Sequence, residues 1–127
     1  MSRPGPATRV DVAIVGGGLV GATLALALAP TRRSVLLIEA VPPESTGQPS
    51  FDDRCSALGN GSRRVLEMLG VWPQLRPAAT PIRGIQVSDA GHFGAARLES
   101  AELGLEAFGY VVPNRSIGAA LWRALEP

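Results

Sequence analysis

The chain has 127 residues, of which 46% are hydrophobic, and its acidic and basic side chains nearly cancel to a formal net charge of +1. This apolar content is ordinary for a globular protein that buries one modest core, and it excludes a disordered tail. No basic patch interrupts the mixture of charges, so no nucleic-acid partner is expected. The single cysteine cannot form an internal disulfide, which fits the reducing cytoplasm, and we expect Cys55 to be a small buried residue. One cysteine and one histidine also provide no metal site.

Residues 1–9 contain two prolines and a glycine and are predicted to be a loose leader. Residues 10–39 are more informative. An apolar run at 10–15 precedes Gly-Gly-Gly-Leu-Val-Gly at 16–21, and an alanine- and leucine-rich segment leads to a second apolar run that ends on Glu39. The order strand, glycine turn, helix, strand and acid predicts a doubly wound α/β domain with a parallel sheet, whose first half holds the ADP part of a dinucleotide.

Each glycine of the motif has an expected role. Gly16 allows the tight turn, and Gly18 lacks the Cβ atom that would hold a pyrophosphate away from the backbone. Gly21 belongs to the inner face of the helix, where a row of small residues at helical spacing permits close contact with the sheet. The other members of this row are Gly18, Ala22, Ala25 and Ala29.

The predicted helix start supplies the remaining contacts. The backbone N–H groups of Leu19 and Val20 should face the phosphates, because they have no acceptor within the helix and lie at the positive end of its dipole. Glu39 should accept hydrogen bonds from the adenosine ribose hydroxyls and would repel a 2′-phosphate.

A membrane or export segment is an alternative for the same stretch. Residues 12–29 carry no charge, two arginines precede them, and small residues come just before Pro30. However, each glycine would cost a helix about 1 kcal/mol relative to alanine, and the Arg32-Arg33 pair follows the apolar run, whereas a twin-arginine signal precedes it. We therefore favour the nucleotide-binding interpretation.

The middle of the chain predicts a loop, a helix and a connector. Residues 41–50 are rich in Pro, Ser, Thr and Gly and indicate a surface loop. Residues 60–69 predict a helix ended by Gly70, with Val65, Leu66 and Leu69 on its apolar face and Arg63, Arg64 and Glu67 turned outward. Trp72 and Leu75 should pack at its exit, before a connector that contains Pro77 and Pro81.

The last part of the chain predicts a hairpin, a strand and a helix. Residues 82–88 alternate as a half-buried strand does, and a turn at 89–91 leads to a second strand at 93–98, outside the parallel sheet. Residues 110–112 indicate a strand that returns to the nucleotide-binding domain. Asn114 can then cap a helix whose apolar positions are Ile117, Leu121, Trp122 and Leu125.

Four segments together resemble the FAD-dependent aromatic hydroxylases, the class A flavoprotein monooxygenases. They are the glycine motif with Glu39, residues 51–58, residues 69–72, and the Ser-Asp-Ala-Gly-His hairpin within residues 87–94. Within this class the ubiquinone-biosynthesis hydroxylases, and among them the 2-polyprenyl-6-methoxyphenol hydroxylases, are the most similar. Composition divides the chain into four segments, and the resemblance identifies them as a leader (1–9), the first part of the FAD-binding domain (10–77), the start of the substrate domain (78–109) and a return to the FAD-binding domain (110–127).

The resemblance also implies a chemistry. Enzymes of this class reduce FAD with NAD(P)H, let the reduced flavin react with O2, and transfer one oxygen atom to a phenol ring, here a polyprenylated phenol. Arg54 corresponds to an arginine that reaches the FAD phosphates, and Asn114 to a polar residue near the cofactor. No residue of this chain is expected to act as a nucleophile or metal ligand. Contact with the inner membrane or with other enzymes of the pathway stays an open alternative to a purely cytoplasmic location.

Plainer roles compete with these assignments. Arg54 could instead pair with Asp52 or Asp53 at the surface, and Asn114 could be only a helix cap. His92 follows a turn, so we expect a surface role and no catalysis.

The family's second cofactor motif, a Gly-Asp pair followed by small residues and a histidine, has no counterpart in residues 110–127. We therefore expect an amino-terminal fragment that binds FAD weakly or not at all and has no hydroxylase activity. An NAD(P)-dependent dehydrogenase domain and a non-catalytic nucleotide-binding module are the alternatives, because the glycine motif alone does not distinguish the cofactors.

Overall fold

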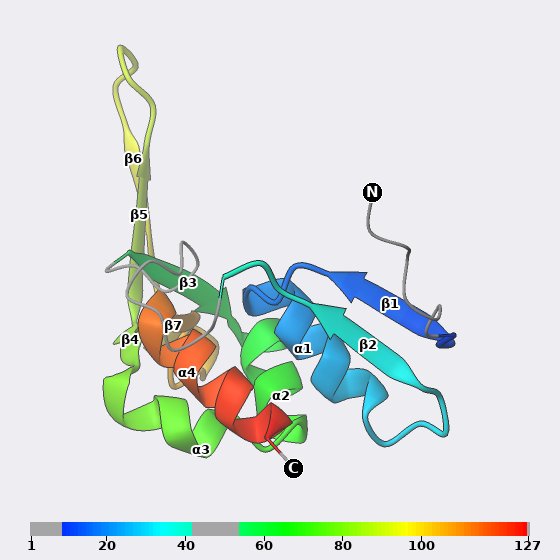
Figure 1. Ribbon diagram of the computed structural model, residues 1–127. Coiled ribbons are helices and arrows are strands. Elements are labelled where there is room, and N and C mark those ends of the chain that lie inside the picture. The colour runs from blue at the N-terminus through cyan, green and yellow to red at the C-terminus, as the bar shows by residue number, and fades with distance from the viewer. Residues whose placement is uncertain (1–8, 42–53, 127) are drawn as a thin grey trace.

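The computed structural model describes residues 9–41 and 54–126, and Figure 1 shows three small sheets around a group of helices. In chain order the elements are β1 (Val12–Val15), α1 (Leu19–Leu28), β2 (Val35–Ile38), β3 (Cys55–Gly59), α2 (Asn60–Met68), α3 (Trp72–Leu75), a 3-10 helix (Arg76–Ala78), β4 (Thr80–Ile82), β5 (Gly84–Ser88), β6 (Ala95–Glu99), a second 3-10 helix (Ser100–Leu103), β7 (Gly109–Pro113) and α4 (Asn114–Leu125). The predicted mixed α/β fold with a parallel sheet and a separate antiparallel hairpin is confirmed. Residues 1–8 of the predicted leader and residues 42–50 of the predicted loop lie outside the described residues.

The first sheet consists of β1 and β2 in parallel, paired from Val12 opposite Val35 to Val15 opposite Ile38. Asp11 and Ser34 connect the amino ends of the two strands. Asp11 Oδ2 accepts hydrogen bonds from the Ser34 backbone N–H at 2.7 Å and from the Ser34 hydroxyl at 2.8 Å. Gly16, Gly17 and Gly18 lie between β1 and α1, in a turn as predicted, and Gly21 lies in the first turn of α1. Among the described residues, no helix is long and apolar enough to span a membrane.

The second sheet is antiparallel, with β7 between β3 and β4. The strand predicted at residues 110–112 is present as β7, but part of the predicted connector is wrong, because β4 contains Pro81. Proline cannot donate to a neighbouring strand, and it is tolerated here because β4 lies at the sheet edge and pairs on one side only.

The third sheet is the hairpin of β5 and β6, paired from Gly84 opposite Glu99 to Ser88 opposite Ala95. The hairpin was predicted, but the half-buried pattern expected of its first strand is present only in part: Ile85 is partly buried, whereas Val87 is 57% exposed. The reason is visible in Figure 1, where the hairpin projects away from the rest of the described chain.

The core lies where α2, α3, α4 and β7 meet. Its fully buried side chains are those of Val71, Leu75, Val112 and Leu121. Helix α2 ends as predicted at Gly70, which has a φ of +73°, and the N–H of Val71 donates to the carbonyl of Leu66 at 2.9 Å. This is the Schellman arrangement, and it turns the chain so that Val71 enters the core.

Two predicted faces need correction. Val65 of α2 is 46% exposed and lines an open apolar groove between α1 and α2. Arg63 is partly covered: it pairs with Glu67 at 2.7 Å, and its guanidinium lies 5.9 Å from the centre of the Trp72 ring. An aliphatic stem and a planar head allow arginine to cover an aromatic ring while its charge stays near water.

The row of small residues on α1 is buried only in part. Ala22 and Ala25 are buried, whereas Ala29 is exposed. Ala22 shares the buried cluster of Leu121, so the small side chains also bring α1 close to α4. Cys55 is exposed at the start of β3, so its predicted burial is wrong: β3 is an edge strand, and an edge strand leaves its end residues open to solvent.

Candidate functional site

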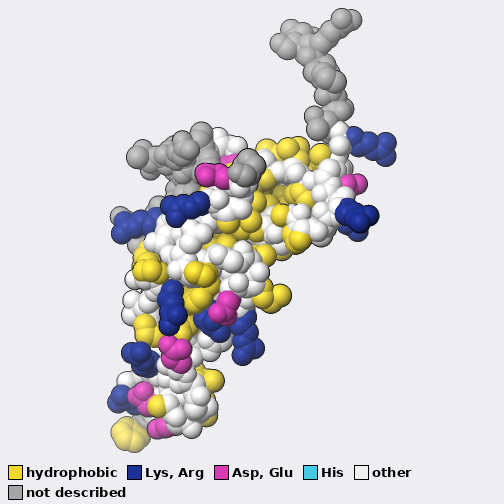
Figure 2. Space-filling model, turned by 90° about the horizontal axis from the view of Figure 1, so that it is seen from below, with side chains coloured by type: hydrophobic (Ala, Val, Ile, Leu, Met, Phe, Trp, Pro, Cys, Tyr) yellow, Lys and Arg dark blue, Asp and Glu magenta, His cyan; other side chains and the backbone are white. Residues whose placement is uncertain are grey.

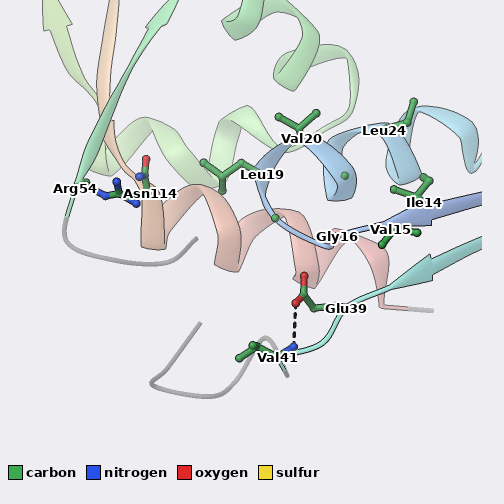
Figure 3. Close-up of a pocket in the computed structure, with 12 residues that line it drawn as sticks. Ile14, Val15, Gly16, Leu19, Val20, Leu24, Glu39, Val41, Arg54 and Asn114 are labelled. Atoms are coloured by element: carbon green, nitrogen blue, oxygen red, sulfur yellow. Dashed lines mark hydrogen bonds between the residues drawn. The ribbon is translucent and has the colours of Figure 1, made fainter. Parts of the chain in front are cut away.

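A pocket of about 730 Å³ opens at the carboxyl ends of β1 and β2, beside the start of α1. Figure 3 shows Arg54 and Asn114 at one end of it and Glu39 with the glycine turn toward the other. Every residue predicted to contact the cofactor lines this pocket: Gly16, Gly18, Leu19, Val20, Gly21, Glu39, Arg54 and Asn114. Residues from four separate parts of the sequence are thus brought together where open α/β sheets bind their ligands.

The motif glycines are required for two different reasons, backbone conformation at Gly16 and lack of space at Gly21. Gly16 has a φ of +99°, a conformation that other residues rarely adopt, and its N–H donates to the carbonyl of Ile38 at 2.8 Å. A Cβ atom on Gly21 would overlap the carbonyl oxygen of Gly16 and press on the side chain of Ile14. The close approach predicted between Gly21 and the sheet is therefore made to Ile14 of β1 and also to the turn that follows it.

The start of α1 presents backbone donors to the pocket. Gly18 occupies the N-cap position, and the first intrahelical bond is donated by Ala22 to the carbonyl of Gly18 at 2.9 Å. The N–H groups of Leu19 and Val20 therefore precede the first donor that has an acceptor within the helix. No side chain caps this helix and its first turn contains no acid, so the positive end of the helix dipole is available to an anion.

Glu39 lies directly at the turn. Its Oε2 accepts a hydrogen bond from the Gly17 N–H at 2.6 Å and its Oε1 accepts one from the Val41 N–H at 2.9 Å. A carboxylate oxygen can accept more than one hydrogen bond, and both oxygens of Glu39 lie at the glycine turn.

Asn114 and Arg54 are joined through the backbone, because the N–H of Asn114 donates to the carbonyl of Arg54 at 2.9 Å. The capping prediction for Asn114 is wrong: Pro113 occupies the N-cap position and no side chain caps α4. Instead, Asn114 Oδ1 accepts a hydrogen bond from the Ser56 hydroxyl at 2.6 Å. This bond orients the Asn114 amide across β3 and beside the pocket.

The other candidates lie elsewhere. His92 is exposed at the hairpin turn, with Nδ1 3.0 Å from Asp89 Oδ2, as the predicted surface role requires. The alternative partners of Arg54, Asp52 and Asp53, lie outside the described residues. Within the described ranges, no group of three potential metal ligands is present.

Trp122 is the site residue that the sequence analysis missed. Its indole Nε1 donates a hydrogen bond to the carbonyl of Gly17 at 3.0 Å. In the sequence it was one apolar position of the last predicted helix, and no local pattern connects it with a turn 105 residues away.

The sequence model of a family described as "FAD binding domain" matches residues 9–117. The chain is 39% identical over 130 residues to ubiquinone hydroxylase UbiL of Rhodospirillum rubrum, covering 94% of this chain and 29% of that protein. It is 38% identical to 3-demethoxyubiquinol 3-hydroxylase of Escherichia coli, covering 91% of this chain and 30% of that protein. The chain thus spans less than a third of the length of these relatives.

Solved structures share the fold. The flavin-dependent monooxygenase PieE, in complex with FAD and substrate, superposes with a TM-score of 0.68 at 23% identity, over 95% of this chain and 22% of that one. The p-nitrophenol 4-monooxygenase PnpA of Pseudomonas putida gives a TM-score of 0.66 at 21% identity, over 90% of this chain and 28% of that one. At these identities the likeness supports the arrangement of elements.

Proposed function

Because this chain belongs to the FAD-binding domain family, we propose that its pocket holds the ADP part of FAD within a flavin-dependent hydroxylase of ubiquinone biosynthesis. The observation that carries the proposal is the meeting of the glycine turn, the open start of α1 and the Glu39 carboxylate in one pocket. The family match favours FAD over a nicotinamide dinucleotide as the resident cofactor, which was the main alternative.

The described residues fit this cofactor by their chemistry. The N–H groups of Leu19 and Val20 supply the donors that a diphosphate requires, and the bare backbone of Gly18 allows it to come close. Glu39 would accept from the adenosine ribose. The Arg54 guanidinium suits a phosphate because it is planar, permanently charged and rich in donors. Asn114 would contribute a polar contact at the same end of the pocket.

Bound FAD supplies the electron transfer from NAD(P)H and the activation of O2, while the protein binds and orients the reactants. We propose a polyprenylated phenol as substrate, supported by the names of the ubiquinone hydroxylases at 38–39% identity. The exposed hairpin of β5 and β6 would begin the substrate domain, with residues 10–77 and 110–127 belonging to the FAD-binding domain. A cytoplasmic location with peripheral contact to the inner membrane or to pathway enzymes is part of the same proposal, since the substrate is apolar.

The proposal is tested by titrating the 15N-labelled chain with FAD, ADP and NADP+ while its amide signals are followed. We expect FAD and ADP to shift the amides of residues 16–21 and Val41, with weak affinity on the order of 1 mM. A 2′-phosphate would face the Glu39 carboxylate, so NADP+ should bind more weakly still.

The Glu39→Gln variant should weaken ADP binding about tenfold, because the ribose loses a charged acceptor. Glu67→Gln is the matched control: it removes an equivalent charge on α2, where Glu67 pairs with Arg63 outside the pocket. Unchanged affinity in Glu39→Gln, or shifts confined to other surfaces, would contradict the proposal.

A further inference from the structure

We propose that Trp122 is a positioning residue for this pocket, holding the glycine turn in the conformation that offers its backbone to a diphosphate. The inference rests on the proposed function, because it concerns the same pocket. It adds a residue that lies outside the glycine motif and outside the set that lines the pocket.

Both backbone polar groups of Gly17 are hydrogen-bonded to side chains of other elements. The carbonyl of Gly17 accepts from the Trp122 indole at 3.0 Å, and the N–H of Gly17 donates to Glu39 Oε2 at 2.6 Å. Gly17 lies between two further glycines, so this turn has more backbone freedom to lose than any other three residues in the site. Two hydrogen bonds from distant elements reduce that freedom before a ligand arrives.

The hydrogen bond also determines the direction of the next peptide group. In a trans peptide the carbonyl of Gly17 and the N–H of Gly18 point to opposite sides. With the carbonyl directed at Trp122, the opposite side of the turn presents the N–H of Gly18. Rotation of this peptide would exchange donor for acceptor, and a carbonyl oxygen repels a phosphate.

The indole also occupies the space beside the turn. A Cβ atom on Gly17 would lie 2.5 Å from Trp122 Cζ2 and 3.1 Å from the Cβ atom of Glu39. The ring and the acid therefore enclose Gly17 from two elements, and they leave room only for glycine.

Helix α4 holds the indole in place. Ile117 and Leu121 anchor this helix in the buried core, and Figure 3 shows the helix running from Asn114 past the glycine turn. Asn114 and Trp122 are about 12 Å apart along the helix at 1.5 Å per residue. One rigid helix thus sets the position of both ends of the pocket.

The first test compares Trp122→Phe with Trp72→Phe. Phenylalanine keeps an aromatic ring but cannot donate a hydrogen bond. Trp72 is the matched control because it is buried against Tyr110, with ring centres 5.0 Å apart, and does not line the pocket. We expect Trp122→Phe to speed amide exchange at Gly17 and Gly18 and to weaken ADP binding three- to tenfold, as loss of one hydrogen bond predicts.

Trp72→Phe should lower stability yet leave the turn amides and the ADP affinity unchanged. Equal effects of both variants on the turn would show that Trp122 acts only through general stability, and this result would overturn the proposal. Unchanged exchange and affinity in Trp122→Phe would overturn it as well.

A measurement on the unaltered chain covers the case in which the variant fails to fold. The indole N–H of Trp122 should exchange more slowly than a free indole and should shift on ADP binding, with Trp72→Phe identifying which of the two indole signals is which. Exchange at the rate of free indole would overturn the proposal. Absence of ADP binding by the unaltered chain would contradict the proposed function itself, whereas normal binding that is indifferent to Trp122→Phe contradicts only the positioning role.

A double-mutant cycle tests the packing directly. Gly17→Ala should weaken ADP binding strongly in the unaltered chain and less in the Trp122→Phe background, where the Cζ2 atom is absent. When two residues do not touch, the changes in binding free energy caused by their substitutions add up. Strict additivity would therefore show that the indole does not enclose Gly17.

Discussion

The buried cluster around α4 and the strands that flank it differ in how their apolar side chains are covered. Leu75 and Leu121 are fully buried between helices, whereas Val15 at the end of β1 is 83% exposed and Phe93 of the hairpin is fully exposed. Figure 2 shows hydrophobic side chains gathered on part of one face, with charged side chains spread around them. Buried apolar side chains are concentrated in the helical cluster with β7, whereas the end of β1 and the hairpin expose theirs.

The candidate site lies on the border between these two regions. Its glycine turn follows β1, whose last residue Val15 is exposed. The indole that contacts the turn comes from α4, which is packed in the buried cluster. Changes in the cluster should therefore reach the pocket through α4, and changes in the hairpin should not.

The largest contrast is expected between a core truncation and a surface truncation. Leu121→Ala should lower the free energy of unfolding by about 2–5 kcal/mol, because it removes contacts and leaves a cavity. Phe93→Ala should change it by less than about 0.5 kcal/mol, since that side chain is exposed. Urea unfolding followed by circular dichroism measures both, and similar losses would mean that the hairpin is packed in solution.

A smaller difference in stability is expected between alanine substitutions of two helical glycines. Gly21→Ala should cost about 1–3 kcal/mol, because the added methyl group overlaps the carbonyl of Gly16. Gly61→Ala, in α2 with no atom within 4 Å of the new Cβ, should stabilise by about 0.4–1 kcal/mol. Thermal unfolding of the two variants gives the comparison. A stabilising Gly21→Ala would show that the turn does not approach α1 as described.

The smallest effect on stability is expected at the amino ends of β1 and β2, where Asp11 contacts Ser34. The Ser34 backbone N–H, and then its hydroxyl, hold the pKa of Asp11 below its ordinary value. A lowered folded-state pKa contributes stability that is present above the unfolded-state pKa and lost as the pH falls through the folded-state value. Asp11→Asn should therefore lower stability slightly at neutral pH and flatten its decline in acid. Unfolding curves from neutral to acid pH would detect this, and identical pH profiles would contradict it.

Local signals made the first half of the fold predictable. The glycine spacing, the apolar runs and Glu39 each act on residues near them in sequence, and the strand, turn, helix and strand appear where they were expected. Gly70 likewise ended α2, because a positive φ at a helix end is a local requirement.

Features set by tertiary contacts were not predictable in this way. Pro81 opposed the prediction of a strand, and only the edge position of β4 makes it acceptable. Asn114 has a capping side chain by type, but the Ser56 hydroxyl from another strand is its partner. The Trp122 contact spans 105 residues and has no sequence signature.

The exposure of Cys55 makes the unaltered chain suitable for site-specific labelling. It is the sole thiol in the sequence, and its neighbour Arg54 lines the pocket. A maleimide fluorophore attached there would place an optical reporter one residue from the end of the pocket where we propose a phosphate, without introducing or removing any cysteine.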